Sequence, residues 1–225
     1  MVDLEDPPCT LHRGVAGPFL ALRAAAAKAG IDLVPTSSFR DFRRQLQIWN
    51  GKCRGERDLL DGRGVRLDPA MLDQDGLVSA ILQWSALPGA SRHHWGTDLD
   101  VIDGAVLPEG RSVRLEPTEY APGGIFSRLN DWLDENAATY GFYRPYAVDR
   151  GGVQPEPWHL SYAPLAQQAL GAFSIEVLEE ALAAEGIDAL DAVRRRLPEI
   201  VERYVMNVEA PPLRAANAIP GTRPA

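Results

Sequence analysis

The sequence predicts an α+β fold in which a small sheet is flanked by helices and followed by a helical extension. Short stretches rich in apolar and aromatic residues are bounded by glycine or proline, as is typical of strands. Longer stretches with apolar residues at helical spacing lie between them. After Pro164 the chain becomes alanine-rich and helical in character. The strand-like stretches are 31–36, 99–103, 140–146 and 158–162.

The first of these strands is expected between two helices. A helix runs from Pro18 to Gly30, since proline is favoured in the first turn and glycine just after the end. Segment 31–36 is a strand that Pro35 either ends or confines to a sheet edge. Segment 39–49 has apolar residues at helical spacing, and a preceding serine is available as its N-cap.

The middle of the chain alternates loops with further elements. Glycine and charged residues dominate 51–68, which is expected to be a surface loop. A helix follows around 77–84, and 105–124 is expected to be mostly loop. The stretch 125–139 forms an amphipathic helix.

Four segments are expected along the chain. Residues 1–16 form an extended lead-in, 17–163 a globular domain, and 164–209 a helical C-terminal extension. Residues 210–225 are rich in proline, alanine and polar residues and are expected to be a disordered tail.

Composition narrows the classes of partner. The 225 residues suffice for one well-buried core or one domain with a helical appendage. The formal net charge of −8 argues against a sequence-independent nucleic-acid binder and gives no support to docking on an anionic surface. Cys9 and Cys53 either form a disulfide or are two unpaired thiols.

Targeting signals are also missing from the sequence. No apolar run approaches the roughly 20 residues of a membrane span. The acidic N-terminus lacks the basic start and apolar centre of a signal peptide, so a cytoplasmic location is expected as the sequence is written. A removed leader or a non-standard export route would instead place the protein in the periplasm or outside the cell.

Potential metal ligands are concentrated in two short stretches. Segment 91–100 holds two histidines and two carboxylates, in a chain with four histidines, and Glu156 and His159 follow roughly sixty residues later. A catalytic zinc centre needs three protein ligands, an open position and a base. Neither helical nor strand periodicity places His93 and Asp100 on one face, so they converge only if Gly96 lets the backbone turn. Glu156 and His159 similarly require a bulge or turn at Pro157.

These stretches belong to an ordered set of four segments that resembles a known family. The pattern Ser-x-His-x-x-Gly-x-x-x-Asp at 91–100 and Glu-x-Trp-His at 156–159 resemble the D-alanyl-D-alanine carboxypeptidase family of zinc peptidases. Segment 37–45 is similar to its Ser-Gly-Tyr-Arg-Ser…Gln segment, and 132–142 to its Trp-Leu…Asn-Ala…Tyr-Gly-Phe segment. The family includes VanY-type carboxypeptidases and VanX-type dipeptidases, and it is related in fold to lysostaphin-type peptidases and the hedgehog signalling domain.

The resemblance implies a role for each motif residue. One zinc ion would be held by His93, Asp100 and His159, on a small antiparallel sheet, with Glu156 as the base. Arg40 matches the family arginine that stabilises the oxyanion. The residues expected to contact substrate are Ser91, Gln45, Trp158 and Ser38.

The chain departs from the family pattern at several positions. Asp98 stands where the family often has alanine, Ser38 where it has glycine and Phe39 where it has tyrosine. The pattern assigns neither Asp98 nor His94 to the metal. His94 either touches substrate, supports a ligand or is purely structural.

The resemblance implies zinc-dependent hydrolysis of peptides containing D-amino acids, with release of C-terminal D-alanine from a peptidoglycan stem peptide as the leading function. The alternatives within the enzyme class are an L,D-carboxypeptidase, a D-Ala-D-Ala dipeptidase and a peptidoglycan endopeptidase. A zinc-bearing binding module without activity is the alternative of another class, and retention of Glu156 argues against it.

Overall fold

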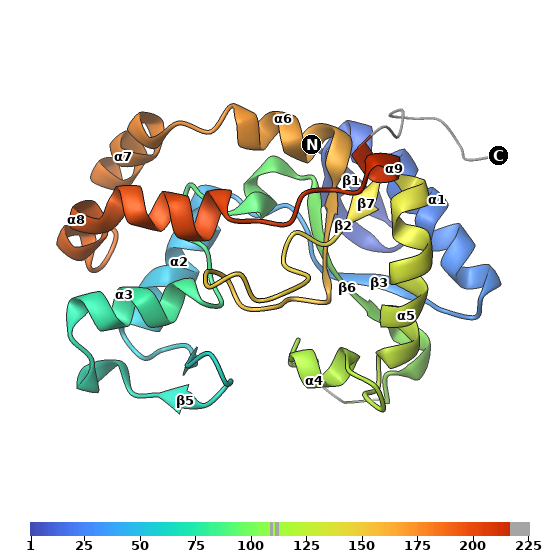
Figure 1. Cartoon of the computed structure of the whole chain (residues 1–225), viewed down its shortest axis with the longest axis horizontal. Helices are drawn as coiled ribbons and strands as arrows, with labels where there is room; N and C mark the ends of the chain where they lie inside the picture. The colour runs from blue at the N-terminus through green and yellow to red at the C-terminus, as the bar shows by residue number, and fades with distance from the viewer. Residues whose placement is uncertain (109, 111–112, 217–225) are drawn as a thin grey trace.

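The computed structural model describes residues 1–108, 110 and 113–216. Its elements gather into two groups (Figure 1). One group consists of a four-stranded sheet with helices against one face, and the other is a cluster of helices drawn at the left of the figure. The predicted α+β fold, with a small antiparallel sheet and C-terminal helices, is confirmed.

The sheet brings together strands that are far apart in the sequence. Its members are β3 (Leu33–Ser37), β6 (Asp98–Asp103), β8 (His159–Tyr162) and β7 (Phe142–Tyr143), in the order β3-β6-β8-β7. All neighbouring pairs are antiparallel. Pro35 lies in the edge strand β3, as predicted, where its missing N–H costs no hydrogen bond inside the sheet.

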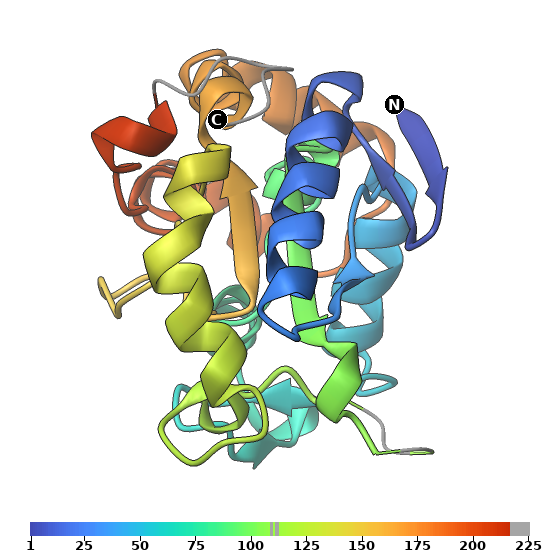
Figure 2. The ribbon, with the colours of Figure 1, turned by 90° about the vertical axis from the view of Figure 1, so that its right-hand side faces the viewer.

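Helices α1 (Arg13–Lys28) and α5 (Ser127–Asn136) cover one face of this sheet (Figure 2). Apolar residues at alternate positions of the strands pack with these helices in one core. This core includes Phe19, Leu22, Leu99, Val101, Leu129, Leu133, Leu160 and Tyr162. Because strand side chains alternate between faces, the polar residues between these positions in β6 and β8 point to the opposite face.

A second core joins helices from the two ends of the chain. It contains α2 (Phe42–Cys53), α3 (Gln74–Leu82), α7 (Ile175–Ala184) and α8 (Leu190–Ile200), with α8 continuing into a wider turn of helix at Val201–Met206. Buried contributors include Trp49, Ile81, Leu178, Leu182, Leu197 and Ile200. The indole N–H of Trp49 donates to the carbonyl of Asp188 (3.1 Å), which ties α2 to the C-terminal helices.

The remaining elements are short. Two small hairpins consist of β1 (Val2–Glu5) with β2 (Pro8–Leu11), and β4 (Leu59–Leu60) with β5 (Arg66–Leu67). The short helices are α4 (Pro117–Tyr120), α6 (Ala163–Gly171) and α9 (Leu213–Ala216). Single turns of 3-10 helix lie at Pro69–Met71, Arg92–Trp95, Gly104–Val106 and Ala137–Tyr140. Among the described helices, none is both long and apolar enough to cross a bilayer.

Several short elements differ from the sequence-based expectations, because their formation depends on contacts with distant parts of the chain. The expected lead-in 1–16 is hairpin β1–β2 followed by the start of α1, and the expected loop 51–68 contains hairpin β4–β5. Asp41, not a serine, caps α2 by accepting from the Arg44 N–H (2.7 Å).

Two further segments, which were expected to be a loop and a disordered tail, contain short helices. The expected loop 105–124 includes α4, and the expected tail from residue 210 includes α9. Residues 217–225 of that tail lie outside the described residues.

Candidate metal centre and active site

Three side chains from two strands and one turn converge on the polar face of the sheet. Ligand atoms of His93, Asp100 and His159 all lie within 4.8 Å of one another, and all three residues are buried. Asp100 is directly opposite His159 in the register of β6 and β8. Directly opposite residues of an antiparallel pair project to the same face, so the pairing register brings this carboxylate and this imidazole together.

Local turns bring in the other two site residues. His93 lies in the 3-10 turn before β6, and Gly96 ends that turn with φ +68°, a conformation that glycine adopts without strain. Pro157 and Trp158 form a turn in which the His159 N–H donates to the Glu156 carbonyl (3.0 Å). Both turns expected from the sequence are therefore present.

Each histidine is held through the ring nitrogen that points away from Asp100. Nδ1 of His93 donates to the Ser38 carbonyl (2.9 Å), and Nε2 of His159 lies 2.9 Å from Oδ1 of Asp98. A carbonyl or carboxylate oxygen only accepts, so these nitrogens carry the protons of the neutral rings. The other two nitrogens are then free to act as ligands, the arrangement found around protein-bound zinc.

The atoms that face one another fit a divalent cation. Nε2 of His93 lies 3.4 Å from Oδ2 of Asp100, and Nδ1 of His159 lies 3.1 Å from Oδ1. Oδ1 of Asp100 is buried, yet no hydrogen bond in the described structure satisfies it. Lone pairs therefore converge on one place, which suits a cation held by two imidazoles and a carboxylate.

Protonation of the histidine competes with such a cation. Burial alone would lower the pKa of His159, but its contacts with Asp100, Asp98 and Glu156 outweigh burial and raise the pKa well above the usual range. The pKa of Asp100 is lowered, because His93 and His159 oppose the effect of burial. A metal bound here would displace the proton on Nδ1, so its affinity falls as the pH falls.

A buried ion pair supports His159 from behind. Asp98 accepts from Nε of Arg92 (2.9 Å) as well as from Thr97 and His159, and it is fully buried. Arg92 also donates to Ser161 (2.7 Å). The Arg92 guanidinium helps to hold the pKa of Asp98 below its usual range against the opposing effect of burial. Asp98 is thus the carboxylate that orients His159.

The sequence contained a signal for this arrangement. Asp98 is the position that departs from the family's alanine, and the arginine six residues earlier supplies its countercharge. What the sequence did not indicate was the imidazole that Asp98 contacts, because His159 lies 61 residues away along the chain.

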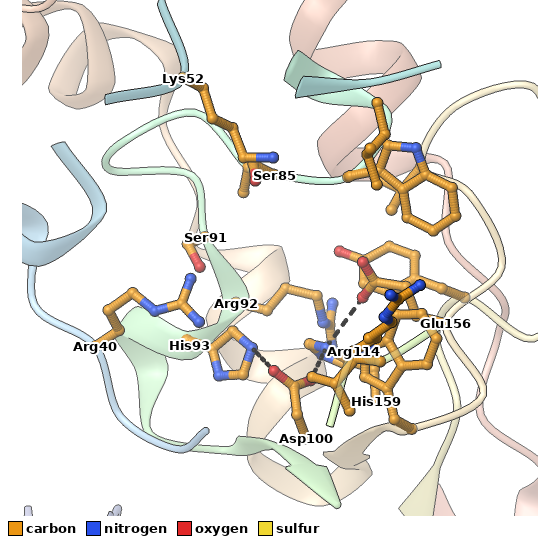
Figure 3. A pocket seen from close by; sticks show the side chains of 17 residues that line it. Arg40, Lys52, Ser85, Ser91, Arg92, His93, Asp100, Arg114, Glu156 and His159 are labelled. Atoms are coloured by element: carbon orange, nitrogen blue, oxygen red, sulfur yellow. Dashed lines mark ion pairs between the residues drawn. The ribbon is translucent and has the colours of Figure 1, made fainter. Parts of the chain in front are cut away.

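A cavity of about 260 Å³ opens over the metal centre (Figure 3). Of the residues predicted to act on substrate, Glu156, Arg40, Ser91 and Trp158 line it. Oε2 of Glu156 lies 3.4 Å from Nδ1 of His159, beside the ligand group. Burial raises the pKa of Glu156, which suits a group that exchanges protons near neutral pH.

Arg40 is held at the edge of this cavity. Its guanidinium donates to Oε1 of Gln45 (2.7 Å) and to Oγ of Ser37 (2.9 Å). In Figure 3 it points toward the space above His93. Burial lowers the pKa of Arg40, but a guanidinium keeps its charge in proteins.

Two predicted substrate contacts are placed behind the cavity wall instead. Gln45 is fully buried, and its amide donates to the Ala86 carbonyl (2.7 Å) while its oxygen holds Arg40. Ser38 uses its carbonyl to hold His93 and its hydroxyl to accept from the Thr10 N–H (3.1 Å). Neither residue lines the cavity, so the structure supports an indirect role for both.

His94 is a support rather than a ligand in this geometry. Nδ1 of His94 contacts the Arg40 carbonyl, and Nε2 accepts from the Gly89 N–H (3.0 Å). Burial, together with the nearby charge of Arg40, lowers its pKa, so the neutral ring is favoured. Both ring nitrogens are engaged, and His94 fixes the backbone that carries Arg40.

Several further lining residues were not anticipated from the sequence. They are Lys52, Ser85, Arg114 and Tyr146. In Figure 3, Lys52 and Ser85 lie across the cavity from Asp100. Each comes from a segment without a recognisable motif, so only the tertiary structure places them at the site.

The sequence is similar to those of known proteins. A sequence model of the family described as VanY, D-alanyl-D-alanine carboxypeptidase, matches residues 9–165. An uncharacterized protein of Haemophilus influenzae is 41% identical over 122 residues, which cover 53% of this chain and 93% of that protein. A D-alanyl-D-alanine carboxypeptidase of Enterococcus faecalis is 33% identical over 149 residues, which cover 64% of this chain but only 46% of the relative.

A solved structure shows the same fold. The structure of VanYB in complex with D-alanine-D-alanine superposes with a TM-score of 0.52 at 23% identity. The match covers 82% of this chain and 88% of that one. The structural similarity therefore extends well beyond the four short segments that resemble the family.

Proposed function

Because the chain belongs to the VanY family of D-alanyl-D-alanine carboxypeptidases, which are zinc metallopeptidases, we propose that it releases C-terminal D-alanine from peptidoglycan stem peptides. The observation that carries this proposal is the convergence of His93, Asp100 and His159 beside Glu156. Three ligands and an adjacent carboxylate in an open cavity are what hydrolysis at a metal centre requires.

We propose a single zinc ion held by His93, Asp100 and His159. Bound there, zinc would polarise a peptide carbonyl and make a water molecule more acidic. Glu156 accepts a proton from the water as it adds to the carbonyl carbon. As the C–N bond breaks, Glu156 returns that proton to the departing amine, leaving a shortened peptide and free D-alanine.

The other residues position the substrate and its charge. Arg40 stabilises the negative charge that develops on the carbonyl oxygen, since its guanidinium stays ionised despite burial. Ser91, which lines the cavity, donates to the terminal carboxylate, and Trp158 forms part of the wall. Gln45 and Ser38 act indirectly, by holding Arg40 and His93.

The test pairs zinc content with product release by the wild type and Glu156→Gln. Three substrates are used: a muropeptide ending in D-Ala-D-Ala, a muropeptide ending in a single D-alanine after an L-centre, and free D-Ala-D-Ala. We expect D-alanine from the first peptide only. Glu156→Gln should lower kcat by about 10²–10⁴-fold while keeping one zinc per chain, because it removes a general base without removing a ligand.

Other outcomes discriminate the alternatives. Release from the second peptide alone indicates an L,D-carboxypeptidase, and cleavage of free D-Ala-D-Ala alone indicates a dipeptidase. Internal cleavage indicates an endopeptidase. Zinc binding without cleavage of any peptide overturns the enzymatic proposal and favours a binding module. The compartment in which the protein acts stays a prediction from the sequence.

A further inference from the structure

A larger cavity adjoins the metal cavity. Its volume is about 790 Å³, against about 260 Å³ for the cavity over the ligands. The two share five lining residues, Lys52, Leu60, Trp84, Arg114 and Leu115, and therefore lie side by side. Hairpin β4–β5 and helix α4 stand on either side of the larger cavity (Figure 1). We call it the distal cavity.

The lining of the distal cavity is more cationic than the molecule as a whole. Four basic residues, Lys52, Arg57, Arg63 and Arg114, line it together with two acidic residues, Asp58 and Glu116. The chain itself carries a net charge of −8. A concave surface lined by an excess of one charge concentrates ligands of the opposite charge.

Two of these cations have no carboxylate partner among the described residues. Arg63 pairs with Asp61 (3.4 Å) and Arg114 with Glu116 (3.4 Å), while Asp58 pairs with Arg66 (3.1 Å). Lys52 and Arg57 take part in no ion pair of the described structure. Their charges are therefore available to an anionic ligand.

The chain holds both cations in place. Nζ of Lys52 donates to the Asp58 carbonyl (3.2 Å), and the Arg57 N–H donates to the Gly51 carbonyl (3.1 Å). The Arg57 side chain lies directly over Gly51, where an added Cβ would be 3.1 Å from its Cδ. Burial and the charge of Arg57 lower the pKa of Lys52, against the opposing effects of the nearby carboxylates of Asp58 and Glu156.

We propose that the distal cavity binds the part of the substrate that precedes the cleaved bond, and that Lys52 and Arg57 bind a free carboxylate there. This inference rests on the proposed function. Lys52 lines both cavities, so an extended chain that leaves the metal cavity on this side, at about 3.3–3.6 Å per residue, passes Lys52 into the distal cavity. A stem peptide supplies such a carboxylate on its glutamyl residue.

A carboxylate site in the distal cavity would distinguish long acidic substrates from dipeptides. The free amine of a D-Ala-D-Ala dipeptide would face the cationic side of the cavity, which is unfavourable for an ammonium group. A carboxylate at that side forms charge-assisted hydrogen bonds with the lysine and the arginine. The preferred substrate is therefore a peptide with an acidic residue upstream of its terminal alanines.

The test uses two pentapeptides that end in D-Ala-D-Ala and have lysine at the third residue. They differ only in the α-group of the glutamyl residue, a free carboxylate in one and a carboxamide in the other. For the wild type we expect kcat/KM to favour the acidic peptide by about ten-fold or more, since a hydrogen bond to a charged group contributes about 1.5–3 kcal/mol. Arg57→Gln and Lys52→Gln should each reduce this ratio several-fold.

A matched control loses one positive charge from α2, the helix that carries Lys52. Arg43 lies on α2 and is exposed outside both cavities, so Arg43→Gln should keep the wild-type ratio. Equal rates for both peptides in the wild type overturn the inference and leave the proposed function intact. An equal loss of the ratio in Arg43→Gln also overturns it, because the effect would then be non-local.

Failure of the proposed function has a different signature. If neither peptide is cut, both are titrated into zinc-loaded Glu156→Gln by calorimetry. Tighter binding of the acidic peptide, lost in the double variant with Arg57→Gln, supports the carboxylate site without catalysis. Equal or absent binding overturns it.

Discussion

His93 and His159 each use one ring nitrogen to hold the ring and direct the other toward Asp100. The holding partner of His93 is a backbone carbonyl, whereas that of His159 is the carboxylate of Asp98. A carboxylate partner makes the imidazole a stronger ligand. Arg92 balances this second buried carboxylate, so the centre does not accumulate uncompensated negative charge.

Asp98→Asn should therefore weaken zinc binding. The amide keeps the shape of the side chain and still accepts from His159, but it loses the charge that strengthens the ligand. We expect the dissociation constant for zinc to rise by about 10–100-fold, the usual effect of losing a partner of a ligand. This dissociation constant is measured by competition with a chromophoric chelator.

Arg92→Gln is the control for this experiment. It breaks the same ion pair but leaves Asp98 free to accept from His159. Removing one partner of a buried pair costs about 3–5 kcal/mol of stability, so both variants are destabilised. If the two variants lose zinc affinity equally, Asp98 acts only through the ion pair.

The two cysteines are free thiols in the structure. Burial, reinforced by the charge of Asp188, raises the pKa of Cys53 to about 12, and burial raises the pKa of Cys9 as well. The reactive thiolate is therefore scarce below the raised pKa values. We expect iodoacetamide to alkylate both residues slowly at pH 8, and Cys53 more slowly than Cys9. Mass spectrometry measures the rate of each reaction.

The urea-denatured protein is the control for this measurement. In urea both thiols regain ordinary pKa values and should react fast. Rapid alkylation of Cys53 in the native protein would contradict its burial.

At the scale of the elements, strand register and turn geometry bring the residues of the candidate metal centre together. Asp100 meets His159 because β6 pairs with β8 in the observed register, and a shift by one residue would turn one of them toward the apolar core. His93 reaches the same place because Gly96 reverses the chain just before β6. The Gly96 carbonyl also accepts from the His12 N–H (2.8 Å), which ties this turn to the start of α1.

Gly96→Ala should disturb this turn. An added Cβ would lie 2.9 Å from the backbone nitrogen of His12, and the positive φ is itself strained for alanine. We expect a loss of about 2–4 kcal/mol in the free energy of unfolding, combining backbone strain with overpacking, together with weaker zinc binding. Urea denaturation measures the first effect and chelator competition the second.

Gly151→Ala is the control, because it introduces the backbone strain of a positive φ without a close contact of the added Cβ. Gly151 also has a positive φ (+79°), but an added Cβ would meet nothing within 4 Å. We expect it to cost only about 1–2 kcal/mol, the strain of the left-handed conformation. Similar losses of zinc affinity in both variants would show that the contacts at Gly96 are unimportant.

For the molecule as a whole, two hydrophobic cores support opposite walls of the cavities. The first lies under the sheet that carries the ligands, and the second joins α2 and α3 to α7 and α8. Lys52 belongs to α2, and Trp84 and Ser85 follow α3. We propose that segment 164–209, expected from the sequence to be an extension, folds together with the peptidase domain.

Leu197→Ala tests this proposal. Leu197 is buried in α8 within the second core, so its truncation should cost about 2–5 kcal/mol. If the segment folds with the domain, zinc release and tryptophan fluorescence should shift together to lower urea concentration. Val177→Ala, at an exposed position of α7, should change stability by no more than about 0.5 kcal/mol. Zinc release that stays at the wild-type urea concentration would show that the segment unfolds independently.

The α+β class, most of the long elements, and the residues that meet at the candidate metal centre could be predicted from the sequence. Local signals were sufficient for these, because apolar periodicity encodes helices and strands and because His93, Asp100, Glu156 and His159 occur in short, ordered motifs. The hairpins of segments 1–16 and 51–68 were missed, since pairing of such short strands depends on what they contact.

The use of the remaining side chains depends on tertiary contacts. Asp98 supports His159 across 61 residues, Gln45 lies behind Arg40 instead of in the cavity, and Lys52 faces the site without any motif. Strand register and the packing of distant helices set these positions. Such contacts join residues far apart in the chain, and local sequence pattern carries no record of them.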